Sequence, residues 1–286
     1  MRPIDQQTIL VTGATDGLRK GLATELAAAG ATVLVHGRSD DRGQATLAEI
    51  ERTTGSDRLR WLRADLSSLD EVRTLAEQTR STTDRLDALV NNAGIGATTN
   101  GSGRREVSRD GYELRFAVNY LAGYLLTREL LPLLTDSAPA RIVNVSSAGQ
   151  APIDFDDVML EHGYEGFRAY CQSKLAQVMF TFDLAEELRD AGVTATCLHP
   201  ASFMPTKMVH DGGIEPASTL QDGIRPTLRL VADPELDGVT GQYFNGLRRS
   251  TPDPQASDPA RRELRELSDR LTGLASGIGG GTVSES

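Results

Sequence analysis

Short apolar stretches alternate with longer helical patterns along most of this chain, and this alternation limits the folds open to it. TILVT (8–12), TVLVHG (32–37) and RIVNVSS (141–147) are rich in aliphatic and β-branched residues, and helical patterns separate them. ALVNN and IVNVS are apolar on both faces, which is typical of strands covered by helices on both sides. Repeated strand–helix units join parallel strands through right-handed crossovers. The sequence therefore predicts an α/β fold, doubly wound, with a mostly parallel sheet of seven strands and helices on both faces.

The 286 residues are expected to form one domain with no second catalytic domain. We place this domain at 1–272, with a long helix across about 108–134. Two segments interrupt the alternation. Residues 148–167 form an insert between a strand and the following helix, and residues 200–222 form a loop-rich segment that is expected to be a substrate lid. Residues 273–286 are rich in Gly and Ser and are expected to be a disordered tail.

Charge and cysteine content exclude several classes of partner. The formal net charge is −10, which argues against nucleic acid or an anionic membrane as the main partner. No segment approaches the ~20 consecutive apolar residues of a membrane span, and no basic region or cleavage site precedes the first apolar run. Cys171 and Cys197 do not form a CxxC pair, so no disulfide framework is expected. We expect a soluble cytoplasmic protein.

Three strand ends carry residues that packing alone does not require. The first strand leads into TGATDG (12–17), where Gly13 would make a tight turn and Gly17 would let the backbone approach a ligand. NNAG (91–94) and Asp65 end two later strands. A Gly-rich turn that opens a helix offers unpaired N–H groups and a positive dipole end to a pyrophosphate. Because the carboxyl ends of parallel strands meet at one edge, these features predict a nucleotide site there.

Tyr170 and Lys174 form the main candidate catalytic pair. They are four residues apart in a helical pattern and project from one face. A free tyrosine titrates near about 10, and an adjacent ammonium lowers that value by stabilising the phenolate. Ser147 ends the RIVNVSS strand, with Ser146 as the competing serine, and its hydroxyl can donate to a substrate carbonyl. Taken singly, each of these residues has an ordinary structural explanation, such as a solvated helix face or a turn. Their joint occurrence along the chain favours a catalytic site.

Together these motifs resemble the short-chain dehydrogenase/reductase family, in particular its retinol-dehydrogenase-like branch. The resemblance covers about residues 7–245 and rests on TGxxxG, NNAG, Asn119, Ser147 and the pair Tyr170 and Lys174, in the family's order. It implies a Rossmann fold and hydride transfer between a nicotinamide cofactor and a carbonyl or secondary alcohol. It further implies Tyr170 as the acid/base, Ser147 as donor to the substrate oxygen, and Asn119 linked to Lys174 through a water.

The resemblance also implies which residues bind the cofactor. They are Gly13, Thr15, Asp16, Gly17, Leu18, Arg19, Arg38, Asp65, Leu66, Asn92, Ala93, Gly94, Tyr170, Lys174, Pro200 and Thr206.

The residues at the end of the second strand favour NADP(H) over NAD(H). NAD usually needs a carboxylate there for the ribose 2′-hydroxyl, whereas this chain has His36, Gly37 and Arg38. A cation in place of the acid suits a 2′-phosphate. Asp16 is evidence against this choice, because relatives that prefer NADP often carry a neutral or basic residue there. By the same resemblance, Asp65 would accept a hydrogen bond from the adenine amino group.

The lid segment limits the substrate only to a class. Met204, Met208, Phe203 and Phe155 could line an apolar pocket or equally could be ordinary packing. An apolar ketone, aldehyde or secondary alcohol is therefore the expected substrate. Ala201 replaces the glycine usual in this part of the family, and Thr206 stands one place later than usual. The four histidines lack metal-site spacing, so no metal is expected.

Arg19 stands where a third glycine would complete the nucleotide turn. It could obstruct the cofactor or bind a phosphate, and from the sequence we expect Arg19→Gly to strengthen NADPH binding. The main alternative function is accordingly a relative with an impaired or repurposed cofactor site that acts as a binding protein or a non-redox enzyme. An epimerase or dehydratase that keeps the nucleotide is also open. The family favours a homodimer or homotetramer, although the insert at 148–167 could block it.

Overall fold

The computed structural model describes residues 1–98 and 103–274. At its centre is a sheet of eight strands in the order β3-β2-β1-β4-β5-β6-β7-β8. The strands are β1 (Thr8–Val11), β2 (Thr32–Gly37), β3 (Leu59–Arg63), β4 (Ala88–Asn91), β5 (Ala140–Val145), β6 (Val193–His199), β7 (Gln242–Asn245) and β8 (Arg248–Ser250). The first seven run parallel, and β8 returns antiparallel to β7. The predicted fold class is confirmed, and the short β8 adds one edge strand to the seven expected.

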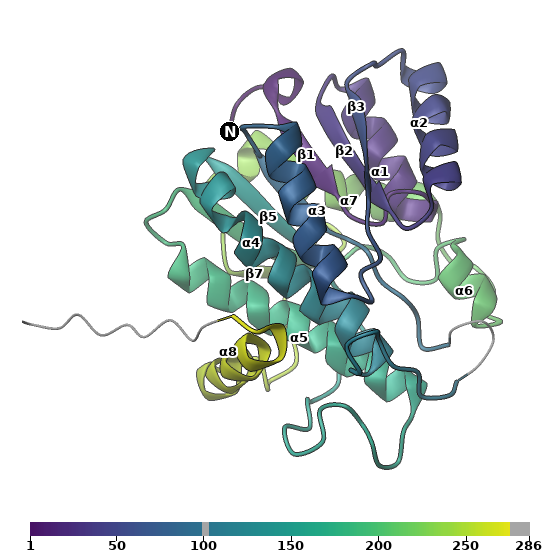
Figure 1. Ribbon diagram of the computed structural model, residues 1–286, viewed down its shortest axis with the longest axis vertical. Helices are drawn as coiled ribbons and strands as arrows, with labels where there is room; N and C mark the ends of the chain where they lie inside the picture. The colour runs from purple at the N-terminus through teal and green to yellow at the C-terminus, as the bar shows by residue number, and fades with distance from the viewer. Residues whose placement is uncertain (99–102, 275–286) are drawn as a thin grey trace, which may run out of the picture.

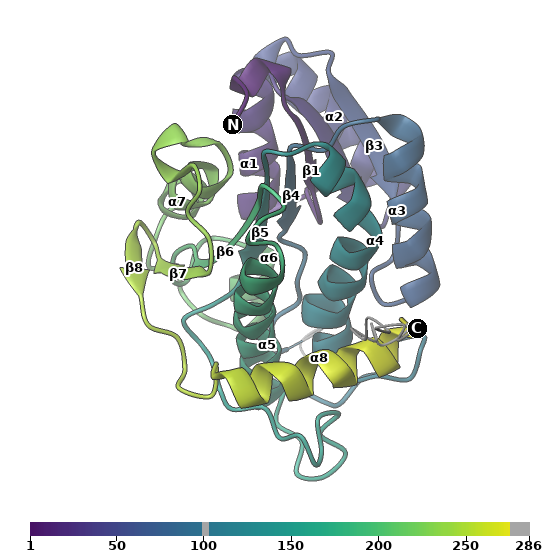
Figure 2. The same ribbon diagram turned by 90° about the vertical axis from the view of Figure 1, so that its left-hand side faces the viewer.

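Helices cover both faces of this sheet (Figures 1 and 2). Their bounds are α1 (Gly17–Ala28), α2 (Asp40–Thr54), α3 (Leu69–Thr82), α4 (Ala122–Asp136), α5 (Gly166–Glu187), α6 (Lys207–Asp211), α7 (Leu220–Ala232) and α8 (Asp258–Thr272). On β1, Ile9 and Val11 point to one core cluster, with α1, α2 and α7, whereas Leu10 points to the other, with α3, α4 and α5. This alternation explains why the strands are apolar on both faces.

The strand order reverses next to β1, and the reversal fixes where a ligand can bind. The chain winds from β1 outward through β2 to β3, and then returns to place β4 on the other side of β1. Loops that leave the carboxyl ends of β1 and β4 therefore diverge and open a crevice between them. Both TGATDG and NNAG lie at this edge.

The helix predicted across 108–134 begins later than expected. Val107 pairs with Glu113 in an isolated antiparallel bridge, and Gly111 turns the chain there with φ +84°. The Glu113 carboxylate then accepts a hydrogen bond from the Phe116 amide at 2.8 Å. A π-helical segment, Phe116–Leu121, leads into α4. The predicted start was wrong because a side chain caps the helix from within the supposed helical pattern.

The last described helix, α8, lies across α5 in Figure 2. It is attached by side chains as well as by packing: the Tyr120 hydroxyl lies 2.7 Å from the Ser268 hydroxyl, and the Tyr124 hydroxyl donates to Asp269 at 2.6 Å. Within the described ranges, no helix is long and apolar enough to cross a membrane. Residues 275–286, in the expected disordered tail, lie outside the described residues.

Candidate active site

The glycine turn after β1 is held by buried side chains on neighbouring strands. Gly13 has φ +69°, and a Cβ there would come within 3.1 Å of Ala93, so the position requires glycine. The Gly13 amide donates to Nδ1 of His36 at 3.0 Å, and Nε2 of His36 lies 3.1 Å from the Ala64 carbonyl. Burial is the main cause that lowers the pKa of His36 to about 4. His36 is therefore neutral near pH 7, with its proton on Nε2 and Nδ1 free to accept.

The NNAG segment is joined to this turn and to Asn119. Thr12 accepts hydrogen bonds from the amides of Asn92 and Ala93 at 2.9 and 3.0 Å. Asn119 accepts from the Ile95 amide at 2.8 Å and donates to the Ile95 carbonyl at 3.1 Å. A Cβ on Gly94 would lie 3.2 Å from the Asn119 side-chain oxygen, so this glycine allows the close approach. From its place in the π-helical segment, Asn119 thus makes direct hydrogen bonds to other parts of the protein. Its water link to Lys174 stays a prediction.

Tyr170 and Ser147 meet in one cleft from different elements. Tyr170 lies in the first turns of α5, and Ser147 follows β5. Burial raises the pKa of the Tyr170 hydroxyl, and a hydrogen bond with the Ser147 side chain opposes that rise. The Ser147 hydroxyl also accepts from the Gly149 amide at 3.0 Å, whereas the Ser146 hydroxyl donates to the Lys174 carbonyl at 2.8 Å. Ser146 is therefore committed to the backbone, which supports the choice of Ser147.

Lys174 is buried beneath this pair and held by two acceptors. Its ammonium donates to the Val145 carbonyl at 3.0 Å and to Oε1 of Gln177 at 2.9 Å. The nitrogen lies 5.8 Å from the centre of the Tyr170 ring. Burial first, and the Arg19 charge second, lower the pKa of Lys174 to about 7. The sequence predicts that the Lys174 ammonium stabilises the Tyr170 phenolate. In the structure, this ammonium depends on its two hydrogen-bond acceptors to remain charged.

These residues line a cleft of about 570 Å³, a size suited to small molecules and cofactors. The predicted site residues that line it are Asp16, Gly17, Leu18, Arg19, Asn92, Gly94, Ser147, Tyr170, Lys174, Pro200 and Thr206. The structure therefore brings most of the predicted site together. Within the described residues, no three His, Cys, Asp or Glu side chains gather as a metal site would require.

The other predicted residues lie around this active-site cleft without lining it. Leu66, Ala93 and Asn119 border a second cavity of about 10 Å³. Thr15 packs near Gly37, and Arg38 is exposed at the end of β2. The Asp65 carboxylate accepts from the Ser67 amide at 3.0 Å and lies 3.8 Å from the Arg109 guanidinium. A role for these residues in cofactor binding, including that of Gly13, stays a prediction.

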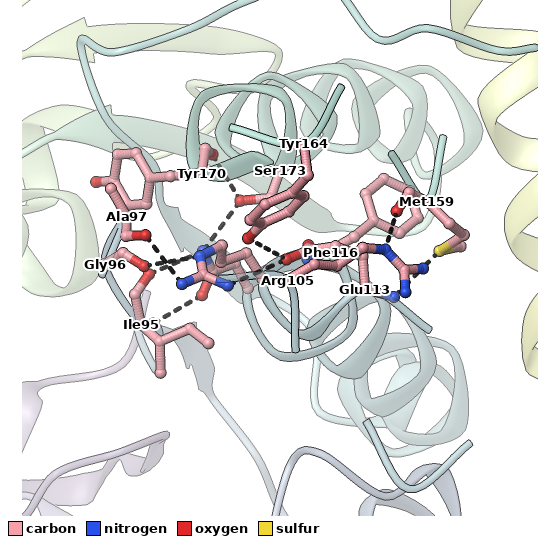
Figure 3. A network of polar contacts seen from close by, with 12 residues as sticks. Ile95, Gly96, Ala97, Arg105, Glu113, Phe116, Met159, Tyr164, Tyr170 and Ser173 are labelled. Carbon is pink, nitrogen blue, oxygen red and sulfur yellow. Dashed lines mark hydrogen bonds and ion pairs between the residues drawn. The ribbon is translucent and has the colours of Figure 1, made fainter. Parts of the chain in front are cut away.

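A network of polar contacts around a buried ion pair (Figure 3) holds the loop after β4, and this loop lines the cleft. Arg115 and Glu113 are both fully buried, with 3.3 Å between nitrogen and oxygen. Arg115 also donates to the carbonyls of Gly96 and Ala97 at 3.2 and 2.9 Å, and the Tyr164 hydroxyl donates to Glu113 at 3.1 Å. The network therefore connects the loop after β4 with the insert that precedes α5.

The predicted lid contributes apolar and polar groups to the cleft. Phe203 and Met204 line it, and Phe203 has φ +52°, an unusual value for a bulky residue. Phe155 instead packs against the core cluster to which α4 and α5 contribute, and the Met208 side chain lies outside the described residues. Phe203 thus adopts a strained backbone conformation at the wall of the cleft.

Several functional candidates are visible in the structure but were not predicted from the sequence. Gln177 contacts Lys174 from three residues further along one helix, a spacing that could have identified it. His199 lines the cleft, with Nε2 at 3.0 Å from the Ser202 hydroxyl. Burial, followed by the Lys174 charge, lowers the pKa of His199. Arg115 and Glu113 carried no sequence signal, because their pairing depends on where the loop after β4 returns.

Comparison with known proteins gives matches over nearly the whole chain. A family model described as short chain dehydrogenase matches residues 7–214. Retinol dehydrogenase 13 of Mus musculus is 37% identical over an alignment of 290 residues, and this alignment covers 95% of this chain and 85% of that protein. Retinol dehydrogenase 14 of Homo sapiens is 33% identical over 94% of this chain and 87% of its own length.

Solved structures show the same architecture. An uncharacterised protein from Mycobacterium paratuberculosis superposes with a TM-score of 0.77 at 30% identity, over 94% of both chains. A short chain dehydrogenase from Escherichia coli CFT073, complexed with NADPH, has a TM-score of 0.69 at 27% identity over 85% of this chain and 97% of its own.

Proposed function

Because the chain belongs to the short chain dehydrogenase family and is an oxidoreductase of the retinol-dehydrogenase-like type, we propose that it transfers hydride between NADP(H) and an apolar carbonyl compound or its alcohol. The observation that carries this proposal is the convergence of Ser147, Tyr170 and Lys174 on one cleft beside the glycine turn. The same convergence argues against the alternative of a binding protein with an impaired cofactor site.

The residues around the turn fit a phosphorylated dinucleotide. The backbone amides of Leu18 and Arg19 lie at the start of α1. Like the first amides of other helices, they have no hydrogen-bond acceptor among the described residues. Arg38 is exposed where an NAD site would carry a carboxylate. The Asp16 carboxylate accepts from the Gly17 amide at 2.7 Å, so it is engaged locally. Complexes of similar structures with NADPH or NADP support the choice of NADP(H).

Each catalytic side chain has a distinct task in the proposed reaction. A bound nicotinamide supplies or accepts the hydride. Tyr170 protonates the carbonyl oxygen during reduction and takes the proton back during alcohol oxidation. Ser147 donates to the same oxygen as it gains charge, and the Lys174 ammonium stabilises the tyrosinate left behind. Three contacts support these tasks: Ser147 with Tyr170, and Lys174 with Val145 and Gln177.

The rim of the cleft supports an apolar substrate. Five large apolar side chains are exposed among the described residues, and three of them line this cleft: Phe167, Phe203 and Ile214. Phe167 comes from the start of α5, whereas Phe203 and Ile214 come from the lid. Exposed apolar groups around a pocket mark a site that takes an apolar ligand. With relatives named retinol dehydrogenases, we propose an aldehyde or alcohol with a long apolar portion.

The test is turnover of retinaldehyde, medium-chain aldehydes and aryl ketones, followed as loss of NADPH absorbance. We expect reduction of at least one of these by the unaltered protein, and loss of reduction in Tyr170→Phe with NADPH binding retained. Full turnover by Tyr170→Phe would refute the assignment of the acid/base.

We also propose a cytoplasmic location, where the free thiols of Cys171 and Cys197 stay reduced. The homodimer or homotetramer stays a prediction.

A further inference from the structure

Arg19 lines the active-site cleft, and the proposed hydride transfer gives it no task. It occupies the third position of α1, after Gly17 and Leu18. The Cα–Cβ bonds of a helix tilt toward its N-terminus, so a long side chain at this position projects back over the first turn. The unpaired amides and the positive dipole end lie there as well. The Arg19 guanidinium is thus carried to the place where a helix binds an anion.

The contacts of Arg19 leave most of its hydrogen-bonding capacity unused. Nη2 donates to the Gly94 carbonyl at 3.5 Å, the long limit for a hydrogen bond. Nη1 lies 3.0 Å from the point where a Cβ on Gly13 would stand. A guanidinium has five N–H donors, and no ion pair satisfies them among the residues that the structure describes. The group therefore lies across the glycine turn, held by one weak contact and facing the cleft.

Charges of both signs act on Arg19. Burial is the main cause that lowers the pKa of Arg19; Asp16 opposes this effect, and Arg38 adds to it. Arg19 in turn lowers the pKa of Lys174. Asp16 is the nearby acid, and its carboxylate already accepts from the Gly17 amide. Within the described part of the chain, two cations, Arg19 and Lys174, and one acid, Asp16, line the cleft in a chain of net charge −10, which fits a ligand that brings negative charge of its own.

We propose that Arg19 is a ligand of the cofactor's diphosphate, and that its guanidinium exchanges the Gly94 carbonyl for phosphate oxygens when the dinucleotide binds. This inference rests on the proposed function. A planar guanidinium can donate two parallel hydrogen bonds to one phosphate, which a glycine cannot do. The third glycine of the turn is thus replaced by a charged ligand. This reverses the expectation, drawn from the sequence, that Arg19→Gly strengthens binding.

The test is a fluorescence titration of NADPH with the full chain and two matched variants. In Arg19→Ala we expect the Kd for NADPH to rise by about tenfold or more, the usual loss for a hydrogen bond between charged groups. Lys20→Ala removes the adjacent charge on the same helix. Lys20 pairs with Glu49 at 2.9 Å, outside the cleft, so that Kd should not change.

Displacement by adenosine 2′-monophosphate, which has no diphosphate, gives the second readout. The Kd for adenosine 2′-monophosphate should be the same for the unaltered protein and for Arg19→Ala. NADPH binding that is unchanged or tighter in Arg19→Ala would overturn the inference and identify Arg19 as an obstruction. Equal weakening of both ligands would overturn it as well, because the effect would not depend on the diphosphate. If the unaltered protein binds no NADPH, the proposed function fails together with the inference.

Discussion

His36 should make the protein lose stability as the pH falls from neutral toward about 5, below the ordinary histidine pKa of ~6.5. The side chain is 1% exposed, accepts from the Gly13 amide and lies against the Ala64 carbonyl. A proton on Nδ1 of His36 would place this N–H group against the N–H group of Gly13. The folded protein therefore resists protonation that the unfolded chain accepts, and stability present above the unfolded pKa is lost on acidification.

The structure also sets the size of this effect. With a folded-state pKa of about 4 against 6.5, the free energy of unfolding should fall by about 2 kcal/mol between about pH 7.5 and about pH 5 from this group alone. The assay is urea unfolding at both pH values. His36→Asn keeps an acceptor near the Nδ1 position but does not titrate, so its fall should be smaller by that amount. His210→Asn, at an exposed position, is the control and should behave like the unaltered protein.

An equal fall in His36→Asn and the unaltered protein would refute the reasoning. It would mean that the imidazole is not held neutral by the glycine turn. NADPH binding offers a second measurement on the same variants, because the turn that His36 holds is part of the proposed cofactor site.

Two further predictions concern single contacts of the site. Gln177→Leu removes an acceptor from the Lys174 ammonium, so the pKa of Lys174 should fall and the loss of carbonyl reduction at high pH should move down by about one unit. Gln172→Leu, which removes another buried glutamine of α5, is the control and should leave this pH profile unchanged; a shift in both would show a general effect on the helix. Arg38→Ala should raise the Kd for NADPH by about tenfold or more and leave that for NADH unchanged, because only NADPH carries the 2′-phosphate. Equal effects on the two cofactors would contradict that assignment.

The sheet and most of the cleft could be predicted from the sequence because they depend on local patterns. Strands such as β1 and β5 are apolar on both faces, and that pattern alone requires helices on both sides. The spacing of Tyr170 and Lys174 places both on one helix face. The turn at Gly13 needs a left-handed backbone, which a glycine in TGATDG indicates directly.

Features that depend on distant parts of the chain were not predictable in this way. The helix after Gly111 begins late because Glu113 caps it, and Glu113 is in turn held by Arg115 and Tyr164 across the insert. The sequence indicates for His36 a place at the cofactor-specificity position, yet its ring turns inward to Gly13. The direction of a side chain depends on what packs around it, and a strand pattern fixes only the face on which it lies.

The most direct test of the central claim is transfer of deuterium from NADPH, labelled with deuterium at both C4 positions of the nicotinamide, to a carbonyl substrate such as retinaldehyde. We expect mass spectrometry to find deuterium on the former carbonyl carbon of the alcohol. We also expect Tyr170→Phe to slow this transfer by about a hundredfold or more while NADPH still binds, as loss of a general acid does. Transfer at an equal rate by Tyr170→Phe, or an alcohol product without deuterium, would contradict the account.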